Sequence, residues 1–319
     1  MPKVSIVIPN YNKGIFLVET IASVQASTLK DWEIILIDDG STDNSVELAQ
    51  ALADCDDRIN IFLQSNQGGG KARNKGIELA KGEFLLFLDS DDLISATCLE
   101  NRINIAESNK DGMGWVFPLL PFEGEFQDQR FISPWIPPKD HFLEKLIEHD
   151  ITWTSMSPLW RTSFIKQHGH WNTHYPRLQD IQFHTHLLLQ KSKIYTFPHL
   201  QADCYYRLDE RKLVLGNRYK YLEKWVQGCG LYLEEFIPIL PKPLKRKITK
   251  TSLACMEVMG HYLRNAQIDA SQFDLLSKEL IQSVPYPYQQ LVFRIYASLL
   301  KHLPFHVPGL AKLFKFCLR

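Results

Sequence analysis

Strand-like and helix-like segments alternate over the first 93 residues, and this alternation constrains the fold more than any other feature of the chain. The strand-like segments are short and rich in apolar residues, as buried strands are. The segments between them space their apolar residues at helical intervals. The predicted strands are 4–9, 33–38, 59–64 and 83–89, and the clearest predicted helices are 14–28 and 71–82. Such alternation predicts an α/β fold with a mostly parallel sheet.

The pattern changes after residue 93. Further predicted elements are a helix at 94–108, a strand at 114–117, an amphipathic helix at 178–190, and strands at 194–197 and 203–208. The stretch 118–138 is rich in Pro and aromatic residues without a clear period, so we expect a long loop that acts as a lid or binding loop.

Only helices are predicted from about residue 212 onward, at 217–236, 243–264, 272–283 and 287–302. We therefore expect an α/β catalytic region at 1–211 and a helical extension at 212–319.

Composition excludes several classes of protein. The formal net charge is +0, whereas nucleic-acid-binding proteins usually carry a basic surface. The six cysteines form no CxxC pair and no zinc-type cluster, which indicates free thiols in a reducing compartment. No apolar stretch reaches the ~18 residues that span a bilayer, and the N-terminus lacks signal-peptide features. A cytoplasmic protein is expected.

Polar, acidic or glycine-rich residues follow each of the first four predicted strands. Ligands of open parallel sheets bind beyond the carboxyl ends of the strands. The four groups are Pro9, Asn10 and Tyr11; Asp38 and Asp39; Asn66 to Gly70; and Asp89 to Asp92. Their convergence predicts one ligand site at this edge of the sheet.

The stretch FLLFLDSDDL (84–93) places three carboxylates at the end of a buried strand, with only Ser90 between the first two. Two unit charges about 4 Å apart repel by roughly 1 kcal/mol in water and by roughly 4 kcal/mol at an effective dielectric of 20. A helix N-cap needs only one acid. We therefore expect a cation that offsets the repulsion.

These groups suit a nucleotide diphosphate. Tyr11 offers a face for a base, and Asp39 can accept a hydrogen bond from a ring N–H. The triplet Gly68–Gly70 permits close backbone approach, and the helix behind it carries Arg73 near its N-terminus, where anions bind. Asp89 and Asp91 can hold a ribose hydroxyl and a divalent cation, Mg²⁺ or Mn²⁺.

Each group also has a plainer interpretation. Asp38–Ser41 can be only a tight turn with a helix cap, and Gly68–Gly70 only a flexible loop. Lys71 and Arg73 can be a solvated helix face. The coincidence at all four strand ends favours the ligand site over these readings taken one by one.

The blocks VSIVIPNYN, EIILIDDGSTD, NQGGGKARNKGIELAKGE and FLLFLDSDD together resemble the family 2 glycosyltransferases, which have the GT-A fold. They follow the family's order over residues 3–92, and a looser resemblance extends to about residue 210 but not to the helical tail. The resemblance implies an inverting transfer of a sugar from a nucleotide-diphosphate donor to a glycan or lipid-linked acceptor, assisted by a metal. Family frequency favours UDP, while GDP and dTDP remain open.

The resemblance also implies roles for single residues. Positions matching Pro9, Tyr11 and Asp39 hold the base, Arg73 belongs to an A-R-N element near the donor, and Asp91 ends a D-x-D motif as the metal ligand. The expected donor site comprises Pro9, Asn10, Tyr11, Asp39, Gly70, Arg73, Asp89 and Ser90. Asp92 is expected to cap the helix that follows.

An inverting transferase needs a base for the proton of the acceptor hydroxyl. In HWNTHYPRLQDIQFHTHLLL the pair Gln179–Asp180 stands where Glu-Asp is common in the family, so Asp180 is the candidate base. The alternative is an acid in the first turn of a helix, which the helix dipole favours. His184 lies one turn further on the same face, and we expect a partly buried histidine there.

The segment 288–319 carries five Lys or Arg residues, no acid, and many apolar residues. Such a segment suits peripheral contact with the inner face of an anionic membrane, as an enzyme of cell-envelope polysaccharide biosynthesis would need. The alternative is a helix that packs its apolar face on the rest of the protein.

Three rival classes fit less well. A haloacid-dehalogenase-like phosphatase usually has its acidic strand early in the chain, whereas FLDSDDL follows the fourth strand. A nucleotidyltransferase would have a Gly- and Arg-containing loop where this chain has NYNKG. A catalytically degenerate module that only binds a nucleotide sugar is the third rival, against which the D-x-D motif and Asp180 both stand.

Overall fold

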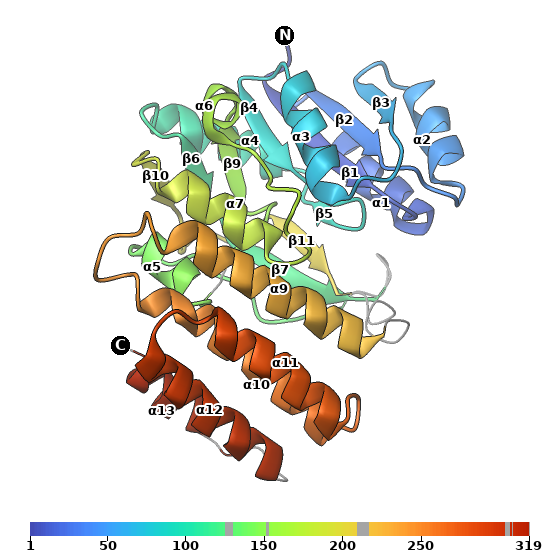
Figure 1. Ribbon diagram of the computed structural model, residues 1–319. Coiled ribbons are helices and arrows are strands. Elements are labelled where there is room, and N and C mark those ends of the chain that lie inside the picture. Colours follow the sequence, from blue (N-terminus) through green and yellow to red (C-terminus); the bar gives the residue numbers. More distant parts are fainter. Residues whose placement is uncertain (125–129, 151–152, 209–216, 304–306, 308, 319) are drawn as a thin grey trace. The chain divides into compact units, whose positions relative to one another are not determined.

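The computed structural model describes residues 1–124, 130–150, 153–208, 217–303, 307 and 309–318. The chain divides into two compact units (Figure 1). The first comprises Met1–His141, Thr152–Thr173 and His186–Asp209, and the second comprises Phe142–Ile151, His174–Thr185 and Glu210–Arg319. The predicted boundary near residue 212 lies outside the described residues.

A seven-stranded sheet forms the centre of the first unit, in the order β10-β6-β9-β4-β1-β2-β3. Its strands are β1 (Val4–Asn10), β2 (Trp32–Asp38), β3 (Ile59–Leu63), β4 (Phe84–Phe87), β6 (Gly114–Val116), β9 (Pro158–Arg161) and β10 (Ile194–Thr196). All neighbours pair in parallel except β9, which is antiparallel to both β4 and β6. The predicted fold class, a mostly parallel sheet flanked by helices with helices at the C-terminal end, is confirmed.

Helices cover both faces of this sheet (Figure 1). Side chains of α1 (Gly14–Gln25), α2 (Ser45–Ala53) and α4 (Cys98–Ser108) join alternate residues of β1, β2 and β4 in one buried apolar cluster. On the other face lie α3 (Gly69–Leu79) and α6 (Thr162–His168). Gly76 brings α3 so close to β1 that a Cβ there would lie 2.2 Å from Val7 Cγ1, which fixes the seating of α3 on the sheet.

A second, smaller sheet in the first unit corrects the expectation of a long loop at 118–138. It consists of β5 (Leu93–Ile94), β11 (Cys204–Arg207), β7 (Leu119–Glu123) and β8 (Arg130–Phe131), in that order. The expectation failed because β7 is held on one side by β11, far along the chain, and only its other side pairs with the nearby β8. For the same reason the helix predicted at 94–108 begins only at Cys98, since Ile94 pairs with Cys204.

The second unit is helical. It contains α5 (Phe142–Ile147), the first residues of α7 (Gln179–Leu188), α9 (Arg218–Phe236), the 3₁₀ turn η1 (Lys247–Thr249), α10 (Lys250–Arg264), α11 (Ala270–Ser283), α12 (Pro287–His302) and α13 (Leu310–Cys317). The predicted helices 217–236, 272–283 and 287–302 are confirmed to within two residues. The helix predicted at 243–264 begins later, at Lys250.

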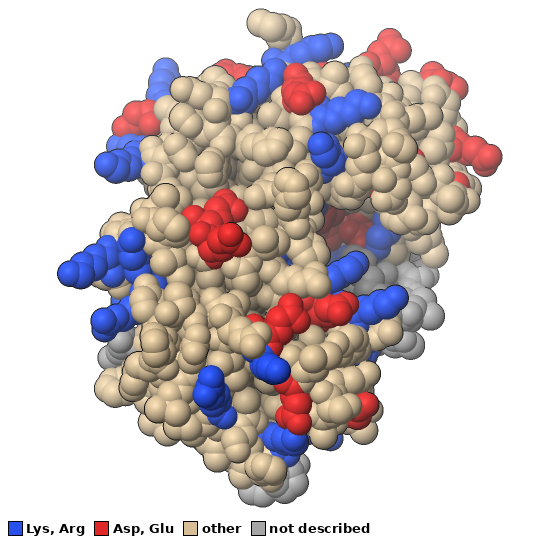
Figure 2. Space-filling view, in the orientation of Figure 1, with Lys and Arg blue, Asp and Glu red and all other residues tan. Residues whose placement is uncertain are grey.

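Charged side chains are interspersed on the face of the molecule in Figure 2, in keeping with the formal net charge of +0. Among the described helices, none combines the length and the apolar composition needed to span a bilayer.

Candidate functional site

Asp38 fixes the end of β2 to the end of β1. Its Oδ2 accepts hydrogen bonds from Asn10 Nδ2 at 2.8 Å and from Ser41 Oγ at 2.7 Å, and its Oδ1 accepts one from the Ser41 amide at 2.9 Å. Both Asp38 and Asn10 are buried. The carboxylate of Asp38 therefore serves the turn after β2. Asn10 Oδ1, by contrast, has no hydrogen-bond partner in the described part of the chain.

Asp39 holds the loop between β3 and α3. Its Oδ1 accepts hydrogen bonds from Gln64 Nε2 at 2.7 Å and the Gln67 amide at 2.8 Å, and its Oδ2 accepts one from the Gly68 amide at 2.7 Å. A carboxylate has about four acceptor sites, so one site on Oδ2 is left for a donor group of a ligand. Asp39, which the sequence predicts to bind the base of the nucleotide, therefore also anchors the glycine-rich loop.

The glycine triplet forms a defined turn at the start of α3. Gly68 has φ +89°, a conformation that side-chain-bearing residues rarely adopt, and it precedes the first helical residue, Gly69. A Cβ at Gly69 would lie 3.1 Å from a guanidinium nitrogen of Arg73, and Gly70 is buried. The turn therefore presents bare backbone beside Arg73.

The first two acids after β4 each bind a cation of the protein. Arg73 Nη2 lies 2.5 Å from Asp89 Oδ1, and Lys13 Nζ lies 2.6 Å from Asp91 Oδ2. The Asp91 side chain is 8% exposed, whereas that of Asp89 is 32% exposed. The offsetting positive charge that the sequence demanded is thus present within the chain itself, from β1–α1 and from α3.

Arg207, on β11, braces the acidic loop from the other side. Its Nε donates to the Asp91 carbonyl at 2.9 Å, and its amide donates to Asp92 Oδ1 at 2.8 Å. The guanidinium also binds Glu19 at 2.7 Å, and Arg207 is 3% exposed. The expectation that Asp92 caps a helix is wrong, because Asp92 leads into β5 and accepts a hydrogen bond from β11 instead.

The ring of Trp171 packs against the guanidinium of Arg73. The guanidinium carbon of Arg73 lies 4.7 Å from the centre of the Trp171 ring. Asn74 pairs with the Trp171 backbone in both directions, at 2.9 Å and 2.8 Å. Because Arg73 is buried while Lys71 is exposed, the solvated-face interpretation holds for Lys71 and fails for Arg73.

The remaining predicted residues of the first unit lie at the same sheet edge. Pro9 is near the end of β1, and Tyr11 follows it with 47% of its surface exposed, so a ring face is accessible. Ser90 is buried between the two paired acids. Of the eight predicted donor residues and Asp91, most belong to the carboxyl ends of β1, β2 and β4 and the loops that follow them, while Gly70 and Arg73 belong to the N-terminal part of α3, which follows β3.

Asp180 belongs to the second unit, in the first turn of α7. The start of α7 is held by Gln182 Nε2, which donates to Glu235 at 2.8 Å, and by Tyr175, whose hydroxyl donates to the same carboxylate at 2.8 Å. Burial, together with Glu235, raises the pKa of Tyr175 well above its usual range. His184 is more fully buried than expected, with 1% of its surface exposed. The role of Asp180 stays a prediction.

Sequence reasoning missed three residues of the site: Lys13, Trp171 and Arg207. Lys13 follows the first predicted strand in NYNKG, so its place at the sheet edge was a usable signal. Trp171 and Arg207 reach the site from 97 and 116 residues away along the chain, and no local pattern announces them.

A buried cluster of Cys98, Asp203 and Cys204 brings three ligand-type atoms within 4.8 Å of one another. The Arg102 guanidinium lies among them, 2.5 Å from Asp203 Oδ1 and 3.0 Å from Cys204 Sγ. Arg102 is fully buried, and its guanidinium is also held by the carbonyls of Met156 and Ser157, which leaves no room for a metal ion among these atoms. This cluster is therefore a structural ion pair with two free thiols.

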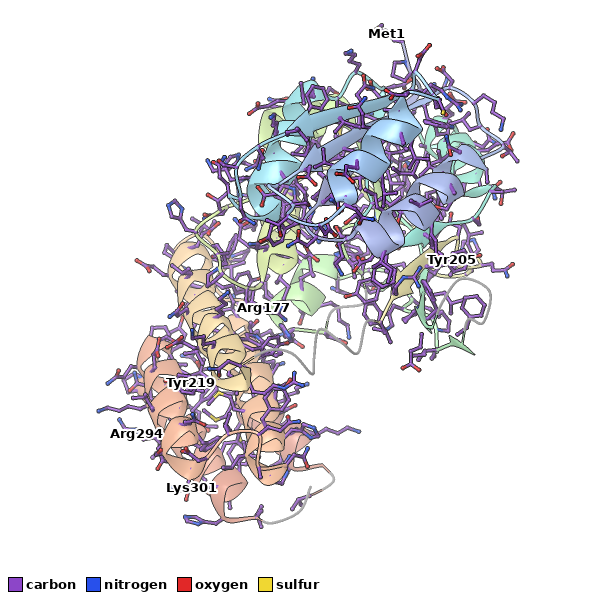
Figure 3. The ribbon with its side chains drawn as sticks, turned by 90° about the vertical axis from the view of Figure 1, so that its right-hand side faces the viewer. Met1, Arg177, Tyr205, Tyr219, Arg294 and Lys301 are labelled. Carbon is purple, nitrogen blue, oxygen red and sulfur yellow. The ribbon has the colours of Figure 1, made fainter. Side chains whose placement is uncertain are left out.

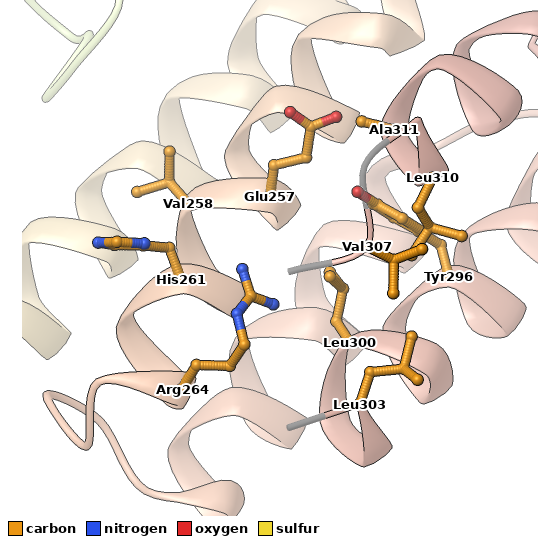
Figure 4. Close-up of a pocket in the computed structure, with 10 residues that line it drawn as sticks. All are labelled: Glu257, Val258, His261, Arg264, Tyr296, Leu300, Leu303, Val307, Leu310 and Ala311. Atoms are coloured by element: carbon orange, nitrogen blue, oxygen red, sulfur yellow. The ribbon is translucent and has the colours of Figure 1, made fainter. Parts of the chain in front are cut away.

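A cavity of about 230 Å³ lies within the second unit, among α10, α12 and the start of α13 (Figure 4). Its walls are mostly apolar, with polar groups from Glu257, His261, Arg264 and Tyr296. It contains none of the predicted donor residues.

The sequence of this chain is similar to those of known proteins. Residues 5–166 match the family described as Glycosyl transferase family 2. The putative glycosyltransferase EpsH of Bacillus subtilis is 33% identical over 177 residues, covering 52% of this chain and 49% of that protein. The GalNAc(5)-diNAcBac-PP-undecaprenol beta-1,3-glucosyltransferase of Campylobacter jejuni is 39% identical over 119 residues, covering 37% and 38%. The chain thus spans about half or less of these relatives.

Two solved structures share the fold. TarS 1–349 of S. aureus superposes with a TM-score of 0.65 at 17% identity, covering 99% of this chain and 90% of that one, and it has been solved with UDP and with UDP-GlcNAc. The mannosyltransferase PcManGT of Pyrobaculum calidifontis, in complex with GDP-Man and Mn²⁺, has a TM-score of 0.58 at 13% identity, covering 99% and 86%. The resemblance inferred from the four sequence blocks is confirmed by the family match.

Proposed function

The chain belongs to glycosyl transferase family 2, and we propose that it transfers a sugar from a nucleotide-diphosphate donor, a UDP-sugar in the first instance, to a hydroxyl of a glycan or lipid-linked acceptor. One observation carries the proposal. The carboxyl ends of β1 to β4 gather an exposed aromatic face, a buried carboxylate with a spare acceptor site, bare glycine backbone and two carboxylates at one edge of the sheet. This combination suits a base, a ribose and a diphosphate in turn.

Each part of the donor has a partner in this proposal. The base stacks on Tyr11 and donates to Asp39, beside Pro9 and Asn10. The ribose binds Asp89 and the backbone near Ser90, and the bare backbone at Gly70 lets the donor approach Arg73. Arg73 is already oriented by Asp89 and Trp171, so little side-chain freedom is lost on binding.

A divalent cation, Mn²⁺ or Mg²⁺, fits the acidic loop. Asp91 and Asp89 supply oxygen ligands of the kind these ions prefer, and the side chain of Lys13, which pairs with Asp91, is 21% exposed and so has room to give way to the ion. Bound at Asp91, such an ion would act as a Lewis acid on the negative charge of the departing diphosphate.

Asp180 is proposed as the base of an inverting reaction. It would take the proton of the acceptor hydroxyl while that oxygen forms its bond to the anomeric carbon. The bond from the anomeric carbon to the phosphate oxygen breaks on the opposite side, and the nucleoside diphosphate leaves with the electron pair.

The acceptor side is proposed from the relatives. The Campylobacter jejuni relative is named for an undecaprenol-linked acceptor, which supports a lipid-linked acceptor here. An enzyme of this kind would act in cell-envelope polysaccharide biosynthesis, as a cytoplasmic protein in peripheral contact with the inner face of the membrane.

Thermal unfolding with UDP, GDP, dTDP and CDP, each with and without Mn²⁺, tests the donor site. A nucleotide at about 100 times its Kd adds roughly 2.7 kcal/mol to the free energy of unfolding. We expect the largest shift with UDP plus Mn²⁺. A shift without any sugar release from UDP-sugars would favour the degenerate binding module, and no shift with any nucleotide would overturn the proposal.

A further inference from the structure

α12 exposes an apolar stripe on the side opposite to its packed face. Tyr288, Leu291 and Ile295 follow one another at intervals of three and four residues, so they share one face of the helix. They are 64%, 55% and 50% exposed. The packed face is formed by Val292, Phe293, Tyr296, Ala297 and Leu300, which are buried. A surface helix usually turns polar side chains to solvent, whereas α12 has an exposed apolar face in addition to its buried one.

α13 repeats this pattern. Phe314 packs on Tyr296 with ring centres 4.4 Å apart. Leu313 and Phe316 remain 58% and 62% exposed. Five of the large apolar side chains that the described residues expose thus lie on two neighbouring helices. Several large exposed apolar residues on neighbouring helices are a feature of interaction surfaces.

The charged side chains that α12 and α13 themselves carry are all positive. The sequence has no Asp or Glu after Glu279, and its five later cations are Arg294, Lys301, Lys312, Lys315 and Arg319. Arg294 and Lys301 are both carried by α12 (Figure 3). Lys301 is paired with Asp274 at 2.5 Å. Arg294, Lys312 and Lys315 form no ion pair within the described ranges, so their charges are available to a partner.

We propose that the exposed residues of α12 and α13 form a docking surface for an anionic lipid bilayer. The apolar side chains would enter the boundary between headgroups and acyl chains, and the lysines and arginine would bind lipid phosphates. A second copy of this chain is the less suitable occupant, because two such basic surfaces repel each other. This surface would make the membrane contact of the proposed function. Its binding to lipid does not depend on transfer activity.

Co-sedimentation of the full chain with lipid vesicles tests this surface. We expect binding to vesicles that contain phosphatidylglycerol, little binding to phosphatidylcholine alone, and weaker binding at high salt. Lys312→Gln with Lys315→Gln removes two charges without touching the buried face, and it should lower the partition coefficient about 30-fold. Leu291→Asp with Ile295→Asp should abolish binding.

Matched controls come from the same unit. Leu275 on α11 is 58% exposed, so Leu275→Asp should leave vesicle binding unchanged. Lys220→Gln with Lys242→Gln removes two exposed lysines from other segments and should have a small effect. Circular dichroism would verify that every variant is folded.

Three results would overturn the proposal. The first is equal binding to both kinds of vesicle, or binding to neither. The second is an equal loss of binding in the control variants. The third is that the chain binds no vesicles but self-associates in sedimentation velocity, and that Leu291→Asp with Ile295→Asp removes this self-association. Because the readout is vesicle binding, these results leave the nucleotide-shift experiment unaffected, and a failed nucleotide shift leaves the docking surface standing.

Discussion

At the scale of single residues, the acids after β4 are held apart by separate partners. Arg73 forms an ion pair with Asp89, and Lys13 forms one with Asp91. The Arg207 amide donates a hydrogen bond to Asp92. Three neighbouring carboxylates would otherwise repel one another at the end of a buried strand. These contacts offset the negative charge within the protein itself and fix the orientation of each carboxylate.

The metal role proposed for Asp91 predicts a large loss of activity without unfolding of the variant. Asp91→Asn keeps the shape but removes the charge, so sugar transfer should fall by about 100-fold or more. The thermal midpoint should shift by only a few degrees. The measurement is turnover of the purified variant beside its unfolding curve. Near-native transfer by Asp91→Asn would contradict the assignment.

In the proposed site, Lys13 would compete with the divalent cation for Asp91. Lys13→Gln should therefore bind Mn²⁺ more tightly in the absence of nucleotide, by up to about fivefold, since a partly exposed ion pair is worth up to ~1 kcal/mol. Electron paramagnetic resonance of free Mn²⁺ measures this directly. Lys71→Gln, which changes an exposed lysine of the neighbouring α3, is the control. An unchanged Mn²⁺ affinity in Lys13→Gln would rule out the competition.

At the scale of elements, the small sheet positions the acidic loop of the large one. β5 follows the loop directly, and β11 pairs with both β5 and β7. Arg207 extends this support to Asp91 and Glu19 while its guanidinium lies 4.5 Å from the centre of the Phe16 ring. The order of the loop thus depends on a strand that is distant in sequence.

Arg207→Met should destabilise the first unit and loosen the loop. The change leaves the carbonyls of Asp91 and Gly124 without their donor, and each buried polar group left unsatisfied costs about 1–3 kcal/mol. The loss of the pair with Glu19 adds less, because that carboxylate is 35% exposed. Urea unfolding measures the loss, and the affinity for UDP should fall with it. Lys193→Met, which removes the exposed pair with Asp111, should leave unfolding nearly unchanged. Equal effects of the two changes would contradict the bracing role.

At the scale of the whole molecule, His149 links the stability of the second unit to pH. Its Nδ1 is enclosed, and its ring lies 5.9 Å from that of Trp225. Burial, with a smaller contribution from the positive charge of Lys315, lowers the pKa of His149 from 6.5 to about 4. Between these two values the unfolded chain binds a proton that the folded chain does not, so stability falls as pH decreases.

The predicted size of this effect is about 2 kcal/mol between neutral pH and the folded pKa, less than the full shift because part of the residue reaches solvent. Urea unfolding at a series of pH values measures it. His149→Gln should flatten the dependence, whereas His170→Asn, at an exposed position, should not. A slope that survives in His149→Gln would assign the effect to other groups.

The sequence by itself determined the alternating elements, the mostly parallel sheet and the edge where the candidate site lies. These follow from local information: apolar runs of strand length, helical spacing, and polar residues placed just after the strands. The residues from Pro9 to Asp91 could therefore be named in advance, because each lies at the end of a strand or just after it along the chain.

Only the tertiary structure decided what each of these residues contacts. The antiparallel β9, the second sheet within 118–138, the true partner of Asp92, and the reach of Trp171 and Arg207 into the site all depend on pairings between distant segments. A local pattern shows which face of a segment will be buried, but not which of the other buried faces will meet it. The division of the acids among Arg73, Lys13 and Arg207 is such a pairing, set by the packed fold.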